Sequence, residues 1–152
     1  MSDKVFTGKW LGQYTYGDGY SERLKGKSGA FILLMEVAGN GRVTGKCLDE
    51  SGSTQMEAVI EGTIMGGKIE FVKTYRHHWQ TDGDGNISEH KDRQSHEVIY
   101  SGSFQNTVFS GEWRIITPVV RADGSIRERV VGGYWIMHRE RELSGNPGQL
   151  GF

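Results

Sequence analysis

The chain has very little cysteine and proline, with one cysteine and two prolines in 152 residues. A single cysteine, Cys47, excludes an intrachain disulfide and any metal site built from several thiolates. No stretch approaches the roughly 18 consecutive apolar residues of a membrane-spanning helix, and the opening MSDKVFTGKW lacks the apolar core of a signal peptide. We therefore expect a soluble, cytoplasmic protein that does not act in a membrane.

An excess of charge of one sign is also missing. The 18 basic and 19 acidic residues give a formal net charge of -1, and like charges form no block along the chain. Nucleic acids and anionic membranes usually require a basic surface that displaces counterions, so we predict neither as a partner. The length is that of one domain, which can bury a core without disulfides or metals.

Glycine and aromatic residues are abundant: 23 glycines accompany 4 Trp, 6 Tyr and 6 Phe residues. Alternating or continuous apolar segments separated by glycine-bearing turns predict β-strands and turns, with a helix at most in residues 21–27. Residues 77–97, rich in Asp, His and Gly, are expected to form a long hairpin or a mobile loop. The predicted strands span residues 5–16, 30–38, 41–49, 56–64, 68–79, 96–104, 107–120 and 126–140.

The triplet Gly-x-Trp occurs at residues 8–10, 111–113 and 133–135, on the first, seventh and eighth predicted strands. Those strands are neighbours only if the sheet closes, and closure also removes the unpaired edges. Within a triplet, glycine and tryptophan face the same side, so each inward tryptophan has a gap beside it. We therefore predict an all-β fold, a single closed eight-stranded antiparallel up-and-down (meander) barrel over residues 1–142. Residues 143–152 are expected to be a flexible C-terminal tail.

A Gly-x-Trp on the first strand and an arginine near the end of the last one resemble the calycin pattern of lipocalins and avidins. Trp10 matches the first position. Arg139 and Arg141 are candidates for the second, and alternation with Trp135 and Met137 favours Arg139. The resemblance implies that the tryptophan packs near one end of the barrel with the arginine over it, and it suggests ligand binding. The opening VFTGKW also resembles fatty-acid-binding proteins, but their helical lid has no counterpart here.

Lys73 occupies a position at which strand alternation calls for an apolar residue, because Phe71 and Tyr75 share its face. A buried lysine must be paired or deprotonated, and it can hold an anion or form a Schiff base. In a second arrangement the register shifts at a bulge, Val72 and Thr74 face inward, and Lys73 faces solvent. The second arrangement is slightly favoured.

Four histidines, His77, His78, His90 and His96, gather in or beside the segment 77–97. His77 and His96 could face each other across two strands and bind a divalent metal, but solvated loop histidines are favoured. The stretch DGDGNISEHKD lacks the first and last ligands of a calcium loop and is interpreted as a turn. No metal and no cofactor are therefore predicted, and Cys47 is expected to be a buried thiol.

The candidate ligand-binding residues share a predicted inward position and an aromatic or polar side chain. They are Trp10, Tyr14, Lys73, Tyr75, Tyr100, Trp113, Trp135 and Arg139. Aromatic walls with a few polar groups are typical of small-molecule pockets, and they are equally typical of a filled barrel interior. Our leading hypothesis is that a lipocalin-like barrel binds a small, partly apolar or aromatic ligand in its interior.

Two other functions stay open. The chain could be a small barrel enzyme that uses Lys73 or a His77/His96 site, although no catalytic residue can be assigned. It could also be a structural or self-association module in which Ile32, Leu34 and Ile116 pack against a second copy, which would make the protein a homo-oligomer.

Overall fold

The computed structural model describes residues 3–17, 19–51, 54–75, 78–81, 87–90 and 97–140. One short 3-10 helix, η1 (Asp3–Phe6), precedes the strands. The strands are β1 (Gly8–Tyr16), β2 (Ser28–Val37), β3 (Arg42–Ser51), β4 (Thr54–Met65), β5 (Lys68–Tyr75), β6 (His78–Thr81), β7 (Ile87–His90), β8 (Glu97–Gln105), β9 (Val108–Val120) and β10 (Ile126–Arg139).

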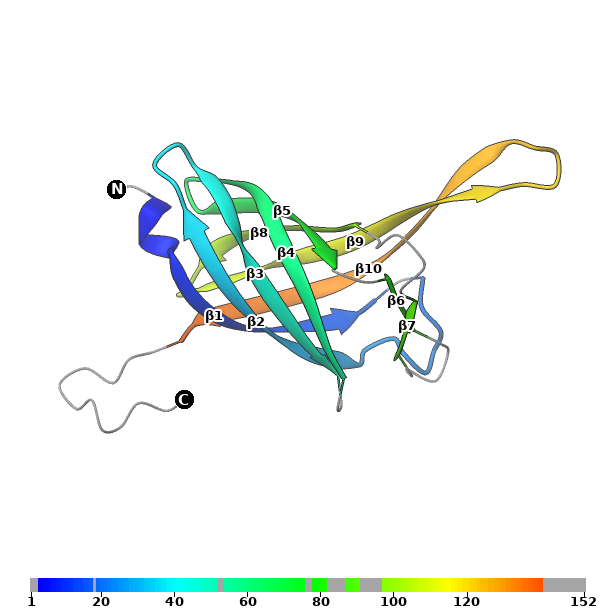
Figure 1. The fold of residues 1–152 in the computed structure, drawn as a ribbon, viewed down its shortest axis with the longest axis horizontal. Helices are drawn as coiled ribbons and strands as arrows, with labels where there is room; N and C mark the ends of the chain where they lie inside the picture. Colours follow the sequence, from blue (N-terminus) through cyan, green and yellow to red (C-terminus); the bar gives the residue numbers. More distant parts are fainter. Residues whose placement is uncertain are drawn as a thin grey trace.

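Eight strands form a closed barrel in the order β1-β10-β9-β8-β5-β4-β3-β2 (Figure 1). All neighbours are antiparallel, and β1 closes the sheet by pairing with β10 from Trp10 opposite Arg139 to Tyr16 opposite Gly133. The strands β6 and β7 form a separate two-stranded sheet between β5 and β8 in the chain. The predicted all-β, eight-stranded up-and-down barrel is therefore confirmed.

The predicted strand limits differ from the observed ones at a few places. The first strand begins at Gly8, because η1 occupies residues 3–6 and Gly8 has a φ of 147° that ends the alternation with Phe6. The strand predicted to reach residue 79 stops at Tyr75, and turns occupy the segment in which a helix was allowed. Part of the region 77–97 forms the β6–β7 hairpin, and the predicted tail 143–152 lies outside the described residues.

An aromatic cluster fills the end of the barrel that η1 covers. The rings of Phe6, Phe104 and Phe109 lie with their centroids 4.8 to 5.1 Å apart, and Trp10 packs 5.1 Å from Phe109. The Arg139 guanidinium lies 4.8 Å from the centre of the Trp10 ring and donates a hydrogen bond to the Thr7 carbonyl. Backbone and side chains thus close this end.

The triplets on β9 and β10 pair reciprocally. The register sets Trp113 opposite Gly133 and Trp135 opposite Gly111. Each indole lies against the neighbouring strand: the Trp113 Nε1 donates to the Tyr134 carbonyl and the Trp135 Nε1 to the Glu112 carbonyl, both at 3.1 Å. The gap that we expected at Gly133 is therefore filled by the Trp113 ring, whereas the β8 backbone at Ser101 and Gly102 lies against Gly111.

The same exchange recurs at Gly12, which faces the Phe31 ring, and at Gly29, which faces the Tyr14 ring. A Cβ built on either glycine would lie within 2.3 Å of the facing side chain. Glycine therefore provides both the close approach of strands and the space for large rings in a narrow barrel.

We predict that Gly133→Ala lowers the free energy of unfolding by about 2 kcal/mol or more, because overpacking a tight core typically costs about 1–3 kcal/mol. A Cβ at Gly133 would lie 1.8 Å from the Thr15 carbonyl oxygen, which is backbone and cannot rotate away. Urea unfolding followed by circular dichroism measures the change.

The matched control is Gly39→Ala, because a Cβ at Gly39 meets no atom within 4 Å and its φ is not positive. This variant should equal the wild type or exceed its stability by up to about 1 kcal/mol. Equal losses in the two variants would contradict the packing explanation.

Candidate functional site

Lys73 points into the barrel and is only 1% exposed. Its Nζ lies 2.6 Å from Asp49 Oδ1 and 3.2 Å from the Tyr100 hydroxyl. The slightly favoured arrangement, with a bulge that turns Val72 and Thr74 inward, is wrong. β5 pairs residue for residue with both β4 and β8, so nothing shifts its register.

Asp49, on β3, is the acidic partner and is also 1% exposed. Its carboxylate accepts hydrogen bonds from Lys73, from the Tyr75 hydroxyl and from the Cys47 thiol, whose Sγ lies at 3.4 Å. Asp49 was not predicted as a site residue, although strand alternation indicated that its side chain faces inward. The alternation that turns Val43 and Cys47 inward continues two residues further to Asp49.

Four aromatic rings surround the Lys73 ammonium. Its Nζ lies 4.9 Å from the ring centre of Tyr100, 5.3 Å from Phe31, 5.4 Å from Tyr75 and 6.0 Å from Tyr14. A cation over aromatic faces is attracted by the ring quadrupoles, and the attraction is stronger when water is excluded. The rings thus stabilise the charge together with Asp49.

Lys73 is held in its protonated form. Burial by itself lowers the pKa of Lys73, but the attraction of the Asp49 carboxylate outweighs burial and raises the pKa well above 10.5. Burial is also the main cause that raises the pKa of Cys47, from 9.0 to about 12. The network therefore holds a lysine cation beside a neutral thiol.

The phenols of this network also stay neutral. Burial is the largest cause that raises the pKa of Tyr14, Tyr75 and Tyr100 above 10.0, and the nearby Lys73 lowers each of them by less. Neutral hydroxyls can donate to Asp49 and accept from Lys73, which is the arrangement that the hydrogen bonds show. The site combines one cation, one anion and several neutral donors.

The predicted site residues divide into two groups. Trp10 and Arg139 lie at the end covered by η1, where the Trp10 Nε1 donates to the Phe6 carbonyl. The others gather around or near Lys73: the Trp135 ring centre lies 5.5 Å from that of Tyr100, and Trp113 packs 6.5 Å from Tyr14. Trp10 and Arg139, the pair implied by the calycin resemblance, are thus separate from the polar network around Lys73.

A second aromatic cluster lies beside Trp113 and includes two tyrosines that the list of site residues missed. The Tyr16 and Tyr20 rings lie 4.8 Å apart, and each lies 6.0 Å from Trp113. Tyr16 continues the inward alternation of β1, which was a usable signal. Tyr20 follows the strand in an irregular segment, where no periodicity marks it. Both side chains are half-buried.

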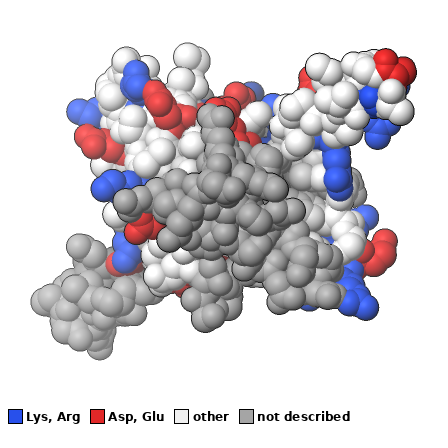
Figure 2. Space-filling view, turned by 45° about the vertical axis from the view of Figure 1, so that its right-hand side comes forward, with Lys and Arg blue, Asp and Glu red and all other residues white. Residues whose placement is uncertain are grey.

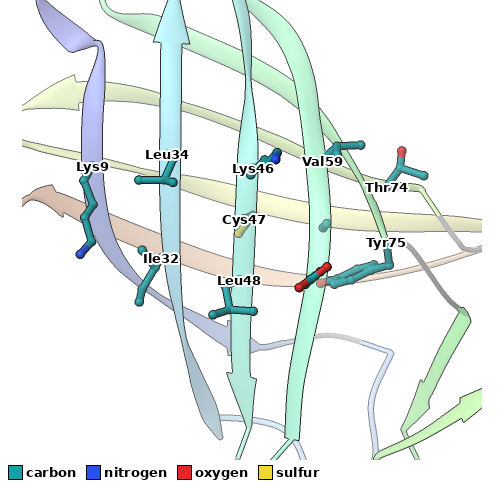
Figure 3. A pocket seen from close by; sticks show the side chains of 11 residues that line it. Lys9, Ile32, Leu34, Lys46, Cys47, Leu48, Val59, Thr74 and Tyr75 are labelled. Carbon is teal, nitrogen blue, oxygen red and sulfur yellow. The ribbon is translucent and has the colours of Figure 1, made fainter.

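The outer wall of the barrel carries a hollow of about 630 Å³ over β1 to β5 (Figure 3). Its lining includes Ile32 and Leu34 on β2, with Lys46 on β3 beside them. Cys47 and Tyr75 also line it, although both make hydrogen bonds to Asp49 in the interior. Tyr75 therefore belongs both to the buried network and to a surface that a ligand can reach.

The described residues give little support to a metal site or to a histidine-based active site. Within them, no group of three or more His, Cys, Asp or Glu side chains is placed to hold a metal ion. His77 and His96 lie outside the described residues. No helix in the described part of the chain has the length and apolar character to cross a membrane.

The fold defines the class of protein, a closed eight-stranded up-and-down β-barrel with a buried Asp–Lys pair. Comparison of the chain with protein-family models, curated protein sequences and solved structures found no match. Any function must therefore be argued from the site itself.

We predict that Lys73→Met lowers the free energy of unfolding by about 3–5 kcal/mol, because it leaves the Asp49 charge buried without its partner. The double variant Asp49→Asn/Lys73→Met should recover at least half of the loss, since no buried charge remains and Asn can still accept from Tyr75. Chemical denaturation followed by circular dichroism gives both values.

The control is Arg42→Met, which breaks the Arg42–Glu61 pair, whose side chains are 59% and 68% exposed. An exposed pair typically contributes less than about 1 kcal/mol, so this variant should lose no more than that. A Lys73→Met loss as small as the control's would contradict the importance of the buried pair.

We predict that the protein loses stability as the pH rises above about 9. Cys47, Lys73 and the buried tyrosines have raised pKa values when folded, so their stabilisation is complete below the unfolded values of 9.0 to 10.5. Above those values the unfolded chain releases protons that the folded chain keeps, and each such group costs about 1.4 kcal/mol per pH unit. Urea unfolding at pH 8, 9.5 and 10.5 measures this decline, and a constant free energy would contradict it.

Proposed function

We propose that the barrel binds a small, partly apolar or aromatic ligand next to the Asp49–Lys73 pair. The observation that carries this proposal is the pair itself, placed with neutral tyrosine hydroxyls at inward positions of a small barrel. A buried ion pair contributes little net stability compared with well-packed apolar side chains. Convergent polar groups among aromatic walls are the usual composition of a ligand site.

The arrangement of the two ends supports the position of the site. One end is closed by η1 and its aromatic cluster, with Arg139 over Trp10, as the calycin resemblance implies. Toward the other end, Tyr16 and Tyr20 are half-buried beside Trp113 and offer aromatic faces. A ligand entering there would place its apolar part against these rings and its polar part toward Tyr75.

The protonated state of Lys73 favours a role in ligand binding over a role as a catalytic amine. A Schiff base requires a neutral amine, whereas Asp49 holds Lys73 as an ammonium. That ammonium already donates to Asp49 and Tyr100, which suits a fixed donor in a recognition site. The nearly neutral charge of the chain also supports a small molecule as partner in preference to a nucleic acid.

Native mass spectrometry of the protein purified from its source cells tests the proposal. We expect the mass of the folded chain to exceed that of the denatured chain by one small molecule. Tyr75→Ala should lose this added mass, because it removes a half-buried ring and a hydroxyl at the network. Tyr134→Ala, which removes a tyrosine that is 58% exposed on the outer face, should keep it.

A titration with 1-anilinonaphthalene-8-sulfonate, excited through the tryptophans, provides a second measurement for protein that has lost its ligand. Binding of this aromatic anion should weaken at least about tenfold in Tyr75→Ala and stay unchanged in Tyr134→Ala. Absence of both added mass and probe binding, or equal effects of the two substitutions, would overturn the proposal.

A further inference from the structure

The strands β9 and β10 continue beyond the barrel as a two-stranded arm, residues 115–131. β8 pairs with β9 only as far as Arg114, and β1 pairs with β10 only as far as Gly133. Beyond these points β9 and β10 pair with each other up to Ile126 opposite Val120. Figure 1 shows the arm projecting from the barrel at the end away from η1. An isolated two-stranded hairpin is marginally stable in water, so a partner is expected to cover it.

One face of this ladder carries a row of exposed apolar side chains that runs from the barrel wall to the tip of the arm. Their exposed fractions range from 40% to 70%. Strand alternation places all of them on the same face, the one opposite to the barrel interior. Figure 2 shows the arm at its upper right, with uncharged surface between a few charged groups. The row consists of Ile136, Tyr134, Val130, Ile116, Val120 and Ile126.

The edge of β9 within the arm does not offer a full set of donors to a further strand. The Gly17 N–H, just after β1, donates to the Gly132 carbonyl. The N–H and C=O groups of one residue in an antiparallel strand point to the same side, and the side alternates along the strand. Even-numbered residues of β10 therefore turn their backbone N–H and C=O groups away from β9. Pro118 lies opposite Glu128, at a position without ladder hydrogen bonds, and its nitrogen faces the edge of β9. The apolar face is therefore the better surface for a partner.

The order of side chains along this face is self-complementary. Rotating the row by 180° about the rung that joins Ile116 and Val130 sets these two side chains against their counterparts. It also sets Tyr134, with Glu112 beside it, against the Val120–Ile126 rung. The same rotation brings the Arg114 rung of one copy opposite the Pro118–Glu128 rung of the other. Because β9 then faces β9 of the second copy, the Arg114 side chain reaches Glu128 diagonally, across one strand spacing. Both residues are exposed, and neither forms an ion pair with another described residue. From the barrel wall to the tip the rungs of this face are Glu112 with Tyr134, Arg114 with Gly132, Ile116 with Val130, Pro118 with Glu128, and Val120 with Ile126.

We propose that this face is a homodimer interface. Two arms pack face to face and antiparallel around a two-fold axis at the Ile116–Val130 rung, and Arg114 of each copy pairs with Glu128 of the other. A two-fold interface uses the same patch on both copies, which is the property that the row possesses. A specific interface buries about 800 Å² per partner, and six large apolar side chains with their charged neighbours provide an area of that order.

Sedimentation equilibrium of the full chain and its charge variants tests the pairing. The wild type should dimerise, and Arg114→Glu or Glu128→Arg should each weaken dimerisation at least about tenfold, because each sets like charges together. The double variant Arg114→Glu/Glu128→Arg restores opposite charges in both pairs and should return to within about threefold of the wild type. A double variant no better than the single ones would overturn the proposed arrangement.

A pair of lysine substitutions tests which face is used. Val130→Lys should abolish the dimer, whereas Val119→Lys lies on the opposite face of the arm, at 39% exposure, and should leave the dimer unchanged. Circular dichroism should show that both variants retain the barrel. Equal effects of the two substitutions, or a wild type that stays monomeric at about 100 µM, would overturn the proposal.

Discussion

The close approach of neighbouring strands that lets eight strands close into a narrow barrel is the constraint on which the other features depend. Inward glycines make this approach possible. A Cβ at Gly111 would lie 1.9 Å from the Ser101 carbonyl oxygen, and one at Gly62 would lie 2.0 Å from the Glu70 carbonyl oxygen. Such distances exclude any side chain, so the sheet can coil tightly only where glycine occurs. At Gly12 and Gly29 the rings of Phe31 and Tyr14 occupy the space beside the glycine instead.

Tight coiling also explains why the Asp49–Lys73 pair can be fully buried. The narrow barrel brings β3, β5 and β8 close enough for the side chains of Asp49, Lys73 and Tyr100 to meet across the interior. Exclusion of water strengthens each of these interactions and raises the penalty for leaving any group unpaired.

In the arm, residues 115–131, the strands β9 and β10 extend beyond the closed barrel and lose their second neighbours. Inside the barrel, β9 and β10 each have a second neighbour, and their inward residues are buried. Beyond Gly133 the same two strands lose those neighbours, and side chains such as Val120 and Ile126 become 70% exposed. The proposed homodimer covers this exposed face without requiring any change in the barrel. The proposed ligand site and the proposed interface thus use separate parts of the molecule.

Alternation and the repeated Gly-x-Trp triplet were enough to predict the strands and the closed barrel, because period-two patterns and turn glycines are local properties of a chain. The same alternation predicted that Trp10 and Arg139 face inward at one end. It did not predict the direction of Lys73: the slightly favoured arrangement, with a one-residue bulge and Lys73 facing solvent, is wrong. Only pairing with both neighbouring strands fixes the register.

The sequence by itself determined an all-β chain, its strand order and the positions at which glycine allows close approach. Tertiary structure alone decided that Asp49 is the partner of Lys73 and that each of two tryptophans lies opposite the other's glycine. The physical reason is that these contacts join residues far apart in the chain. Local periodicity fixes the face on which a side chain lies, whereas strand register and barrel closure fix what it meets there.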